Sequence, residues 1–180
     1  FLRLVLPLFP HEAQAAAPVL AFLAMAAIVL GALSAYGQND FKRLVAYSSV
    51  NHMGFVVLGI AAAAWVAGSS DPSMRLSGTI ATTGVVLQMF NHGLSAAAMF
   101  FLVGVVYDRA HTRDLDELGG GIWQLAPVYG GILVFSSMAS LGLPGLNGFV
   151  SEFAIVRGAW PVFSGITAVS MIGLFFTGAY

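Results

Sequence analysis

Three ionisable side chains lie inside or beside long apolar stretches of the chain: His52, His92 and Glu152. Placing an ionisable side chain in a membrane-spanning helix costs roughly 2.5–3.5 kcal/mol on insertion scales, so such residues usually serve a function. An imidazole titrates near neutral pH and accepts a proton on one nitrogen while donating from the other. A carboxyl is seldom needed for helix packing alone. We therefore expect these three side chains to form a proton path.

Five neutral polar residues lie near them at helical spacing: Ser48, Asn51, Gln88, Asn91 and Ser95. Ser48 and His52 are four positions apart and share a helix face. Gln88, His92 and Ser95 fall at i, i+4 and i+7, which predicts one polar stripe on an otherwise apolar helix. We expect the stripes to face the bundle interior and to support a relay of protons. The alternative is that the neutral residues, and even a lone histidine, only join helices through hydrogen bonds.

The composition is that of a membrane protein. The 180 residues are 58% hydrophobic and 8% charged, whereas a soluble domain carries about 25% charged residues. A net charge of -1 leaves no basic patch for nucleic acid. The absence of Cys from the sequence excludes disulfides and thiolate metal or iron–sulfur sites. The four His residues lack ligand spacing, so we expect no metal and no redox cofactor in this chain.

Polar, turn-forming connections divide the chain into segments long enough to span a bilayer. We expect one all-α transmembrane domain over residues 1–180, with spans at about 15–37, 44–66, 79–107, 122–158 and 162–180. The fourth span is interrupted by Pro144-Gly145-Leu146-Asn147-Gly148. This predicts either one span broken in the middle or two short helices that meet at a re-entrant turn. Unpaired backbone cannot face lipid, so the break must face protein or water, as at the ion sites of transporters.

Charges in the connections predict an orientation. The loops at 38–43 and 107–121 share one side of the membrane and hold Lys42, Arg43, Arg109 and Arg113. The positive-inside rule places that side in the cytoplasm, or in the matrix of a mitochondrion. The chain opens on Phe1 without a start Met or a signal peptide, and it closes inside an apolar run. We therefore expect it to be an internal fragment of a longer polytopic protein.

Four ordered motifs resemble the antiporter-like membrane subunits of respiratory complex I. They are DFKRLVAYSSVNHMG at 40–54, NHGLSAA at 91–97, YDRAHTRD at 107–114 and GLPGLNGFVSEF at 142–153. The resemblance implies a larger bundle of inverted repeats with one proton path per subunit. It also implies that His52, His92 and Glu152 lie on that path. L- and N-type subunits and related sodium/proton antiporters typically carry Lys at the position of Glu152, so the glutamate indicates an M-type subunit.

The resemblance implies a function as well. The chain would belong to a proton-translocating subunit of NADH:quinone oxidoreductase, in a bacterial inner membrane or a mitochondrial inner membrane. NAD, FMN, iron–sulfur clusters and quinone would be bound by partner subunits, and this chain would contact other membrane subunits, lipid and protons. Two related alternatives are a subunit of a multi-subunit cation/proton antiporter and the equivalent subunit of a photosynthetic NAD(P)H or ferredoxin:plastoquinone complex. A third is a bundle that only seals and braces a larger assembly.

Overall fold

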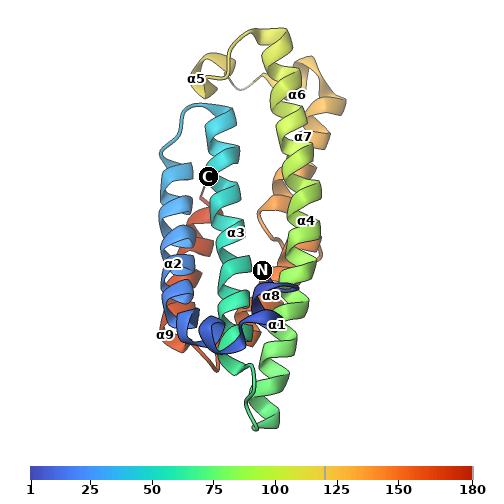
Figure 1. The fold of residues 1–180 in the computed structure, drawn as a ribbon. Helices are drawn as coiled ribbons and strands as arrows, with labels where there is room; N and C mark the ends of the chain where they lie inside the picture. Colours follow the sequence, from blue (N-terminus) through green and yellow to red (C-terminus); the bar gives the residue numbers. More distant parts are fainter. Residues whose placement is uncertain (120, 180) are drawn as a thin grey trace.

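Three long helices form the body of the fold, which Figure 1 shows as a ribbon. In the computed structural model, which describes residues 1–119 and 121–179, they are α2 (Pro10–Tyr36), α3 (Phe41–Val66) and α4 (Pro72–Ala110). Each is long and apolar enough to cross a membrane by length and composition. All named elements of the described residues are helices, which confirms the expected all-α, polytopic fold.

Capping residues fix where α3 and α4 begin. The Asp40 carboxylate accepts a hydrogen bond from Arg43 N at 2.9 Å, and the Asp71 carboxylate accepts one from Ser73 N at 2.8 Å. Pro72 occupies the start of α4, where its missing N–H leaves no helical hydrogen bond unmade. The connections from α2 to α3 and from α3 to α4 are short. Consecutive helices among α2, α3 and α4 run antiparallel to each other (Figure 1).

The third span is longer than the expected 79–107, because α4 already begins at Pro72. Ser77 and Thr79, in its first turns, donate their hydroxyl protons to carbonyls of the same helix, at 3.0 Å each. These side chains are satisfied within the helix, so the helix continues beyond its apolar part. α2 also begins before the expected first span, at Pro10. Hydropathy thus marks the apolar part of a helix rather than its hydrogen-bonded ends.

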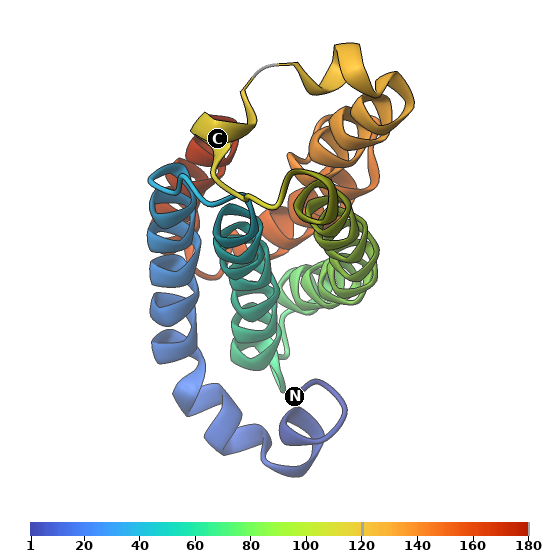
Figure 2. The ribbon, with the colours of Figure 1, turned by 90° about the horizontal axis from the view of Figure 1, so that it is seen from above.

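α3 lies at the centre of the bundle, between α2 and α4, as the view from above shows (Figure 2). In its apolar stretch 67% of the residues are buried, against 33% in α2 and 28% in α4. Among the described residues, three apolar clusters include residues of α3, and the smallest joins Ala64 to Ala13 and Ala17 of α2. Two larger clusters lie along the rest of the helix. The larger joins Ile28 of α2, Phe55 of α3 and Val85 of α4. The smaller surrounds Val45, nearer the start of α3, and Met99 of α4.

The fourth span is interrupted twice. It consists of α6 (Ile122–Leu125), α7 (Pro127–Ser140) and α8 (Asn147–Ala159), and α9 (Ser164–Thr177) follows. α7 packs beside the upper part of α4 and α8 beside the lower part, so the chain enters this span near one end of the bundle and leaves it near the other (Figure 1). The helices thus follow one another along the bundle, which agrees with the expected helix broken around Pro144 to Gly148.

Two glycines allow the backbone to turn within the break. Gly142 has φ of 72° and Gly145 has φ of 100°, in the region that side chains with a Cβ disfavour. Between them lies Pro144, which has no N–H to continue a helix. The break therefore lies inside the segment at 144–148 and just before it, and α8 restarts at Asn147.

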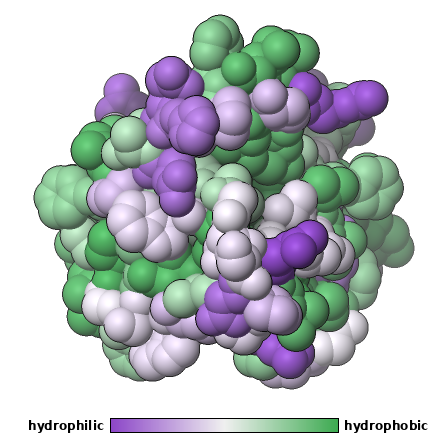
Figure 3. Space-filling view, turned by 60° about the horizontal axis from the view of Figure 1, so that its bottom comes forward, coloured by the Kyte–Doolittle hydropathy of each residue, from purple (hydrophilic) through white to green (hydrophobic). Residues whose placement is uncertain are grey.

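The connections at the two ends of the bundle differ. At the upper end in Figure 1, Phe41 N donates to Arg113 O and Leu115 N donates to Asn39 O, each at 2.9 Å, so the two expected basic loops lie side by side. The short helix α5 (Leu115–Leu118) follows directly. At the lower end lies α1 (Val5–Leu8), and Figure 3 shows hydrophilic side chains interrupting a largely hydrophobic surface there.

α8 approaches α4 closely because glycines stand at the contact. A Cβ added to Gly84 of α4 would lie 2.8 Å from Ile155 N of α8. A Cβ added to Gly158 of α8 would lie 2.7 Å from both Ala81 Cβ and Ser77 O of α4. The backbones can meet at this distance only without side chains between them, as is common between membrane helices.

Replacing Gly158 with alanine in the full-length protein is therefore expected to destabilise it by about 1–3 kcal/mol, because the new methyl group overpacks the α4–α8 contact. The measurement is the thermal-unfolding midpoint of the purified protein. Gly104→Ala in α4 is the control, since nothing among the described residues lies within 4 Å of a Cβ there. Equal midpoints for the two variants would contradict this packing.

Candidate functional site

Glu152 lies in the second turn of α8 and is only 3% exposed. The break before α8 places this turn at mid-height in the bundle, where it faces α3 and α4 (Figure 1). A buried carboxylate needs hydrogen-bond donors to replace water. The neighbouring helices supply two.

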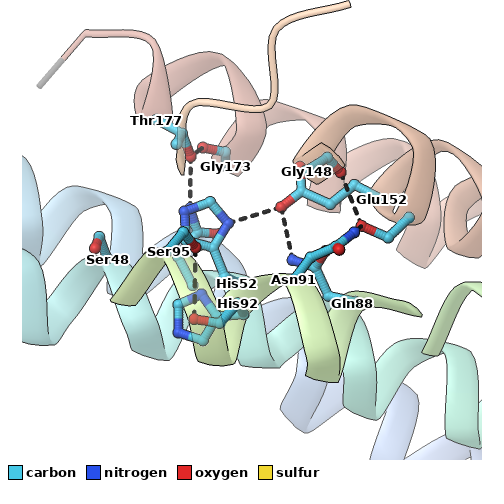
Figure 4. A network of polar contacts seen from close by, with 12 residues as sticks. Ser48, His52, Gln88, Asn91, His92, Ser95, Gly148, Glu152, Gly173 and Thr177 are labelled. Carbon is cyan, nitrogen blue, oxygen red and sulfur yellow. Dashed lines mark hydrogen bonds and ion pairs between the residues drawn. The ribbon is translucent and has the colours of Figure 1, made fainter. Parts of the chain in front are cut away.

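The carboxylate of Glu152 contacts one side chain from each neighbouring helix. His52 Nδ1 of α3 lies 2.7 Å from Glu152 Oε1, and Gln88 Nε2 of α4 donates to the same oxygen at 3.1 Å. His52 and Gln88 are each 2% exposed. Figure 4 shows the imidazole and the carboxylate pointing toward each other, with Gln88 approaching from the α4 side. Residues from three helices thus meet at one oxygen atom.

A second set of hydrogen bonds holds α8 against α4. Ser151 donates its hydroxyl proton to Gln88 Oε1, so both ends of the Gln88 amide bond to α8. Asn91 Nδ2 donates to Asn147 O at 2.9 Å and to Ser151 Oγ at 3.3 Å. Ser151 was not among the polar residues expected at the site. Its position directly before Glu152 was the signal that could have found it.

His92 lies beside His52 rather than beside Glu152. The two imidazole rings are 5.3 Å apart between centroids and are tilted by 39°. His92 is half-buried. Ser95, at the end of the same expected stripe, donates to His92 O of its own helix at 3.4 Å. The stripe therefore divides: Gln88 reaches Glu152, His92 reaches His52, and Ser95 reaches neither.

Asn51 and Ser48 of α3 make other contacts. Asn51 Nδ2 donates to Thr177 Oγ1 of α9, and Thr177 Oγ1 donates to Gly173 O at 3.1 Å. Ser48 Oγ donates to Val45 O of its own helix at 2.8 Å. Asn51 thus joins α3 to α9, although it is the chain neighbour of His52. Thr177 was not expected at the site either, because no local pattern relates residues 126 positions apart.

A cavity of about 440 Å³ opens beside His52, on the side toward the start of α3. Most of its lining is apolar, and four hydroxyl groups from three helices, α3, α7 and α9, line it as well: those of Ser48, Ser137, Ser140 and Thr177. His52 Nε2 is buried and has no hydrogen-bond partner among the described residues. A cavity of this size has room for water beside its hydroxyl groups.

The described residues bring no three His, Cys, Asp or Glu side chains close enough to hold a metal ion. What they bring together is an imidazole, a carboxylate, an amide and hydroxyls in hydrogen-bond contact. His52 Nδ1 and Glu152 Oε1 are 2.7 Å apart, which is hydrogen-bond distance. A proton can therefore pass between these two atoms without either side chain having to move.

The fold and the site together define a class: a polytopic α-helical membrane protein with a discontinuous helix that carries a buried carboxylate. Residues 1–177 match the family described as NADH:quinone oxidoreductase/Mrp antiporter, transmembrane. The chain belongs to that family. The resemblance expected from the four sequence motifs is confirmed.

Relatives in this family carry the names of complex I subunits. The chain is 45% identical to NADH-quinone oxidoreductase subunit M of Pseudomonas aeruginosa, over 99% of this chain and 32% of the relative. It is 49% identical to NAD(P)H-quinone oxidoreductase chain 4 2 of Trichodesmium erythraeum, over 79% of this chain and 23% of the relative. The chain thus spans about a third, or less, of the curated relatives it matches.

The fold also matches a solved structure. A chain of respiratory complex I from Thermus thermophilus with bound NADH superimposes with a TM-score of 0.84 and 29% sequence identity. The match covers 100% of this chain and 35% of that chain. The arrangement of helices around the break is therefore similar to that of part of a complex I membrane chain.

We expect Gly142→Ala to disturb the site as well as the backbone. The alanine would have to adopt φ near 72°, and its Cβ would lie 3.1 Å from Glu152 Oε2. Gly68→Ala is the matched control, because Gly68 has φ of 82° and nothing among the described residues within 4 Å of its Cβ. In both variants the backbone strain should lower the free energy of unfolding by about 1–3 kcal/mol.

Only Gly142→Ala should also displace the carboxylate, so its thermal-unfolding midpoint in the full-length protein should fall further than that of Gly68→Ala. If the two midpoints fall equally, the contact between the break and Glu152 has no energetic consequence.

Proposed function

We propose that this chain forms part of a proton-translocating membrane subunit of NADH:quinone oxidoreductase, respiratory complex I. One observation carries the proposal: a buried carboxylate on α8, the helix after the break, lies 2.7 Å from a buried imidazole on α3. The names of the relatives, subunit M and chain 4, support the same assignment.

The proposed chemistry is proton exchange along a row of side chains. With Glu152 ionised, His52 carries a proton on Nδ1 and donates it to Glu152 Oε1. A proton that reaches His52 Nε2 allows the Nδ1 proton to pass to the carboxylate, so one proton is relayed through the ring. The ring must then return to its first tautomer, by turning over or by exchanging protons with its neighbours, before it relays the next. Gln88 keeps the carboxylate oriented, since its Nε2 donates to the same Oε1 atom.

Two features beside the His52 ring support the movement of protons to it. The ring of His92 lies 5.3 Å away between centroids, so the two imidazoles are neighbours across α3 and α4. The hydroxyl-lined cavity lies on the other side and extends toward the basic end of the bundle. Ser48 lines that cavity next to His52, which gives it a role in hydrating the path.

The proposal assigns the remaining parts of the reaction to other subunits. NAD, FMN, iron–sulfur clusters and quinone would be bound there, and the electrons would never enter this chain. This chain would respond through its charges and helix contacts, in a bacterial inner membrane or a mitochondrial inner membrane. The paired loops around Lys42 and Arg113 would face the cytoplasm or the matrix, by the positive-inside rule.

A second candidate is a subunit of a cation/proton antiporter, because the description of the family includes Mrp antiporters. In that case the same residues would move protons against another cation, without an electron donor. The relative from Trichodesmium erythraeum, named for an NAD(P)H-quinone oxidoreductase, favours a quinone-linked complex with a different donor instead.

Glu152→Gln in the full-length chain tests the proposal. The amide still accepts a hydrogen bond from His52 but cannot take up a proton. A positioned acid–base group contributes about 10²–10⁴-fold to a proton transfer, so NADH-driven proton uptake into inverted vesicles should fall at least about tenfold. The coupled quinone reductase rate should fall with it. Uptake is normalised to assembled complex.

Glu12→Gln is the control, since Glu12 is an exposed carboxyl in the first turn of α2. Normal uptake in Glu152→Gln would make the carboxylate a structural residue and overturn the proposal. Proton uptake that depends on added sodium and not on NADH would favour the antiporter instead.

A further inference from the structure

Three cationic side chains surround a cavity at the upper end of the bundle, away from the His52–Glu152 site. Lys42 and Arg43 of α3 and Arg113 of the neighbouring loop line it, and the cavity measures about 510 Å³. The Asp40 carboxylate lies among them, 3.6 Å from Arg113 Nε. Three cations against one carboxylate leave the cavity with an excess of positive charge.

Helix stability does not explain why Lys42 and Arg43 stand where they do. Both occupy the first turn of α3, where the positive end of the helix dipole disfavours cations. The Asp40 carboxylate is already engaged there, as the acceptor for Arg43 N and as the partner of Arg113. Among the residues that line the cavity the positive charge is therefore only partly compensated, and an anion would be stabilised there. The carboxylates of Asp114, Asp116 and Glu117 belong to the same end of the bundle but do not line the cavity.

The other side of the cavity is apolar. Ala46, one turn further along α3 than Lys42, and Phe100 of α4 complete its lining, and both are exposed. A ligand that fits this cavity has a negatively charged end and an apolar remainder. A phospholipid has this chemistry, and basic pockets between membrane helices are suited to anionic lipid headgroups.

Two tyrosines indicate that the cavity lies at the level of the membrane surface. Tyr47, one turn below Arg43, is 40% exposed, and Tyr107 is 46% exposed. The guanidinium of Arg113 lies over the Tyr107 ring, 5.2 Å from its centroid. Exposed tyrosines beside cations are typical of the boundary between headgroups and acyl chains.

We propose that this cavity binds an anionic phospholipid from the leaflet on the side of the two paired loops. The headgroup phosphate lies between Lys42, Arg43 and Arg113, and one acyl chain runs along Ala46 and Phe100. The bound lipid bridges the start of α3 and the end of α4. Nothing in this inference depends on the proton path.

The test is native mass spectrometry of the full-length protein, purified in mild detergent with the complex it forms and titrated with phosphatidylglycerol. Phosphatidylcholine and inorganic phosphate are the comparison ligands. Each Lys or Arg near a membrane surface contributes about a fivefold factor in affinity for anionic lipid, so Lys42→Gln with Arg43→Gln should weaken phosphatidylglycerol binding about thirtyfold. Arg3→Gln with Arg75→Gln removes two cations at the opposite end of the bundle and should leave binding unchanged.

Ala46→Trp is a second variant that keeps every charge and fills the apolar side of the cavity. It should also weaken phosphatidylglycerol binding, even if the double variant fails to assemble. Unchanged binding in Ala46→Trp, or equal binding of phosphatidylcholine, would overturn the proposal. Complete displacement of the lipid by inorganic phosphate would also overturn it, because the cavity would then bind a free anion. If the double variant loses a neighbouring subunit but still binds the lipid, the cations contact a protein partner and the proposal is wrong.

Discussion

A carboxylate buried among membrane helices requires hydrogen-bond donors, and the donors of Glu152 come from two other helices. His52 of α3 and Gln88 of α4 both contact Glu152 Oε1, at 2.7 and 3.1 Å. Each contact needs α8 at one depth and one rotation relative to its neighbours. The break before α8, the glycines at its contact with α4 and the Gln88–Ser151 hydrogen bond all serve that placement.

The polar site lies between two apolar clusters along α3. Phe55 belongs to the cluster on one side of His52 and Val45 to the cluster on the other. The clusters hold α3 against α2, α4 and α7 and limit where water can reach the site. The cavity beside His52 is lined by members of the smaller cluster, so it approaches His52 from the side of the start of α3.

α3 also connects the site to the membrane surface. Its first turn carries Lys42 and Arg43 and is bonded to the loop that follows α4, through Phe41 N and Arg113 O. His52 lies further along the same continuous helix. Whatever occupies the basic cavity therefore acts on the helix that holds the imidazole. A lipid there would fix the start of α3 relative to α4, which is the relation on which the His52–His92 spacing depends.

Local sequence determined much of this protein. Composition and the length of the apolar stretches were sufficient for an all-α membrane fold, because the requirement to satisfy backbone groups in lipid leaves few alternatives. Pro144 and its flanking glycines marked the break, since their effect on the backbone is local. The rarity of ionisable residues in apolar stretches singled out His52, His92 and Glu152, and their role in moving protons stays a prediction.

Only the tertiary structure decided which of these residues meet. Gln88 and Ser95 belong to one expected stripe, yet only Gln88 bonds to Glu152. Asn51, beside His52 in the chain, bonds to Thr177 of α9 instead. These pairings depend on how each helix is rotated and how deeply it sits against its neighbours. Helix periodicity fixes which residues share a face, but the packing of side chains between helices fixes what that face touches.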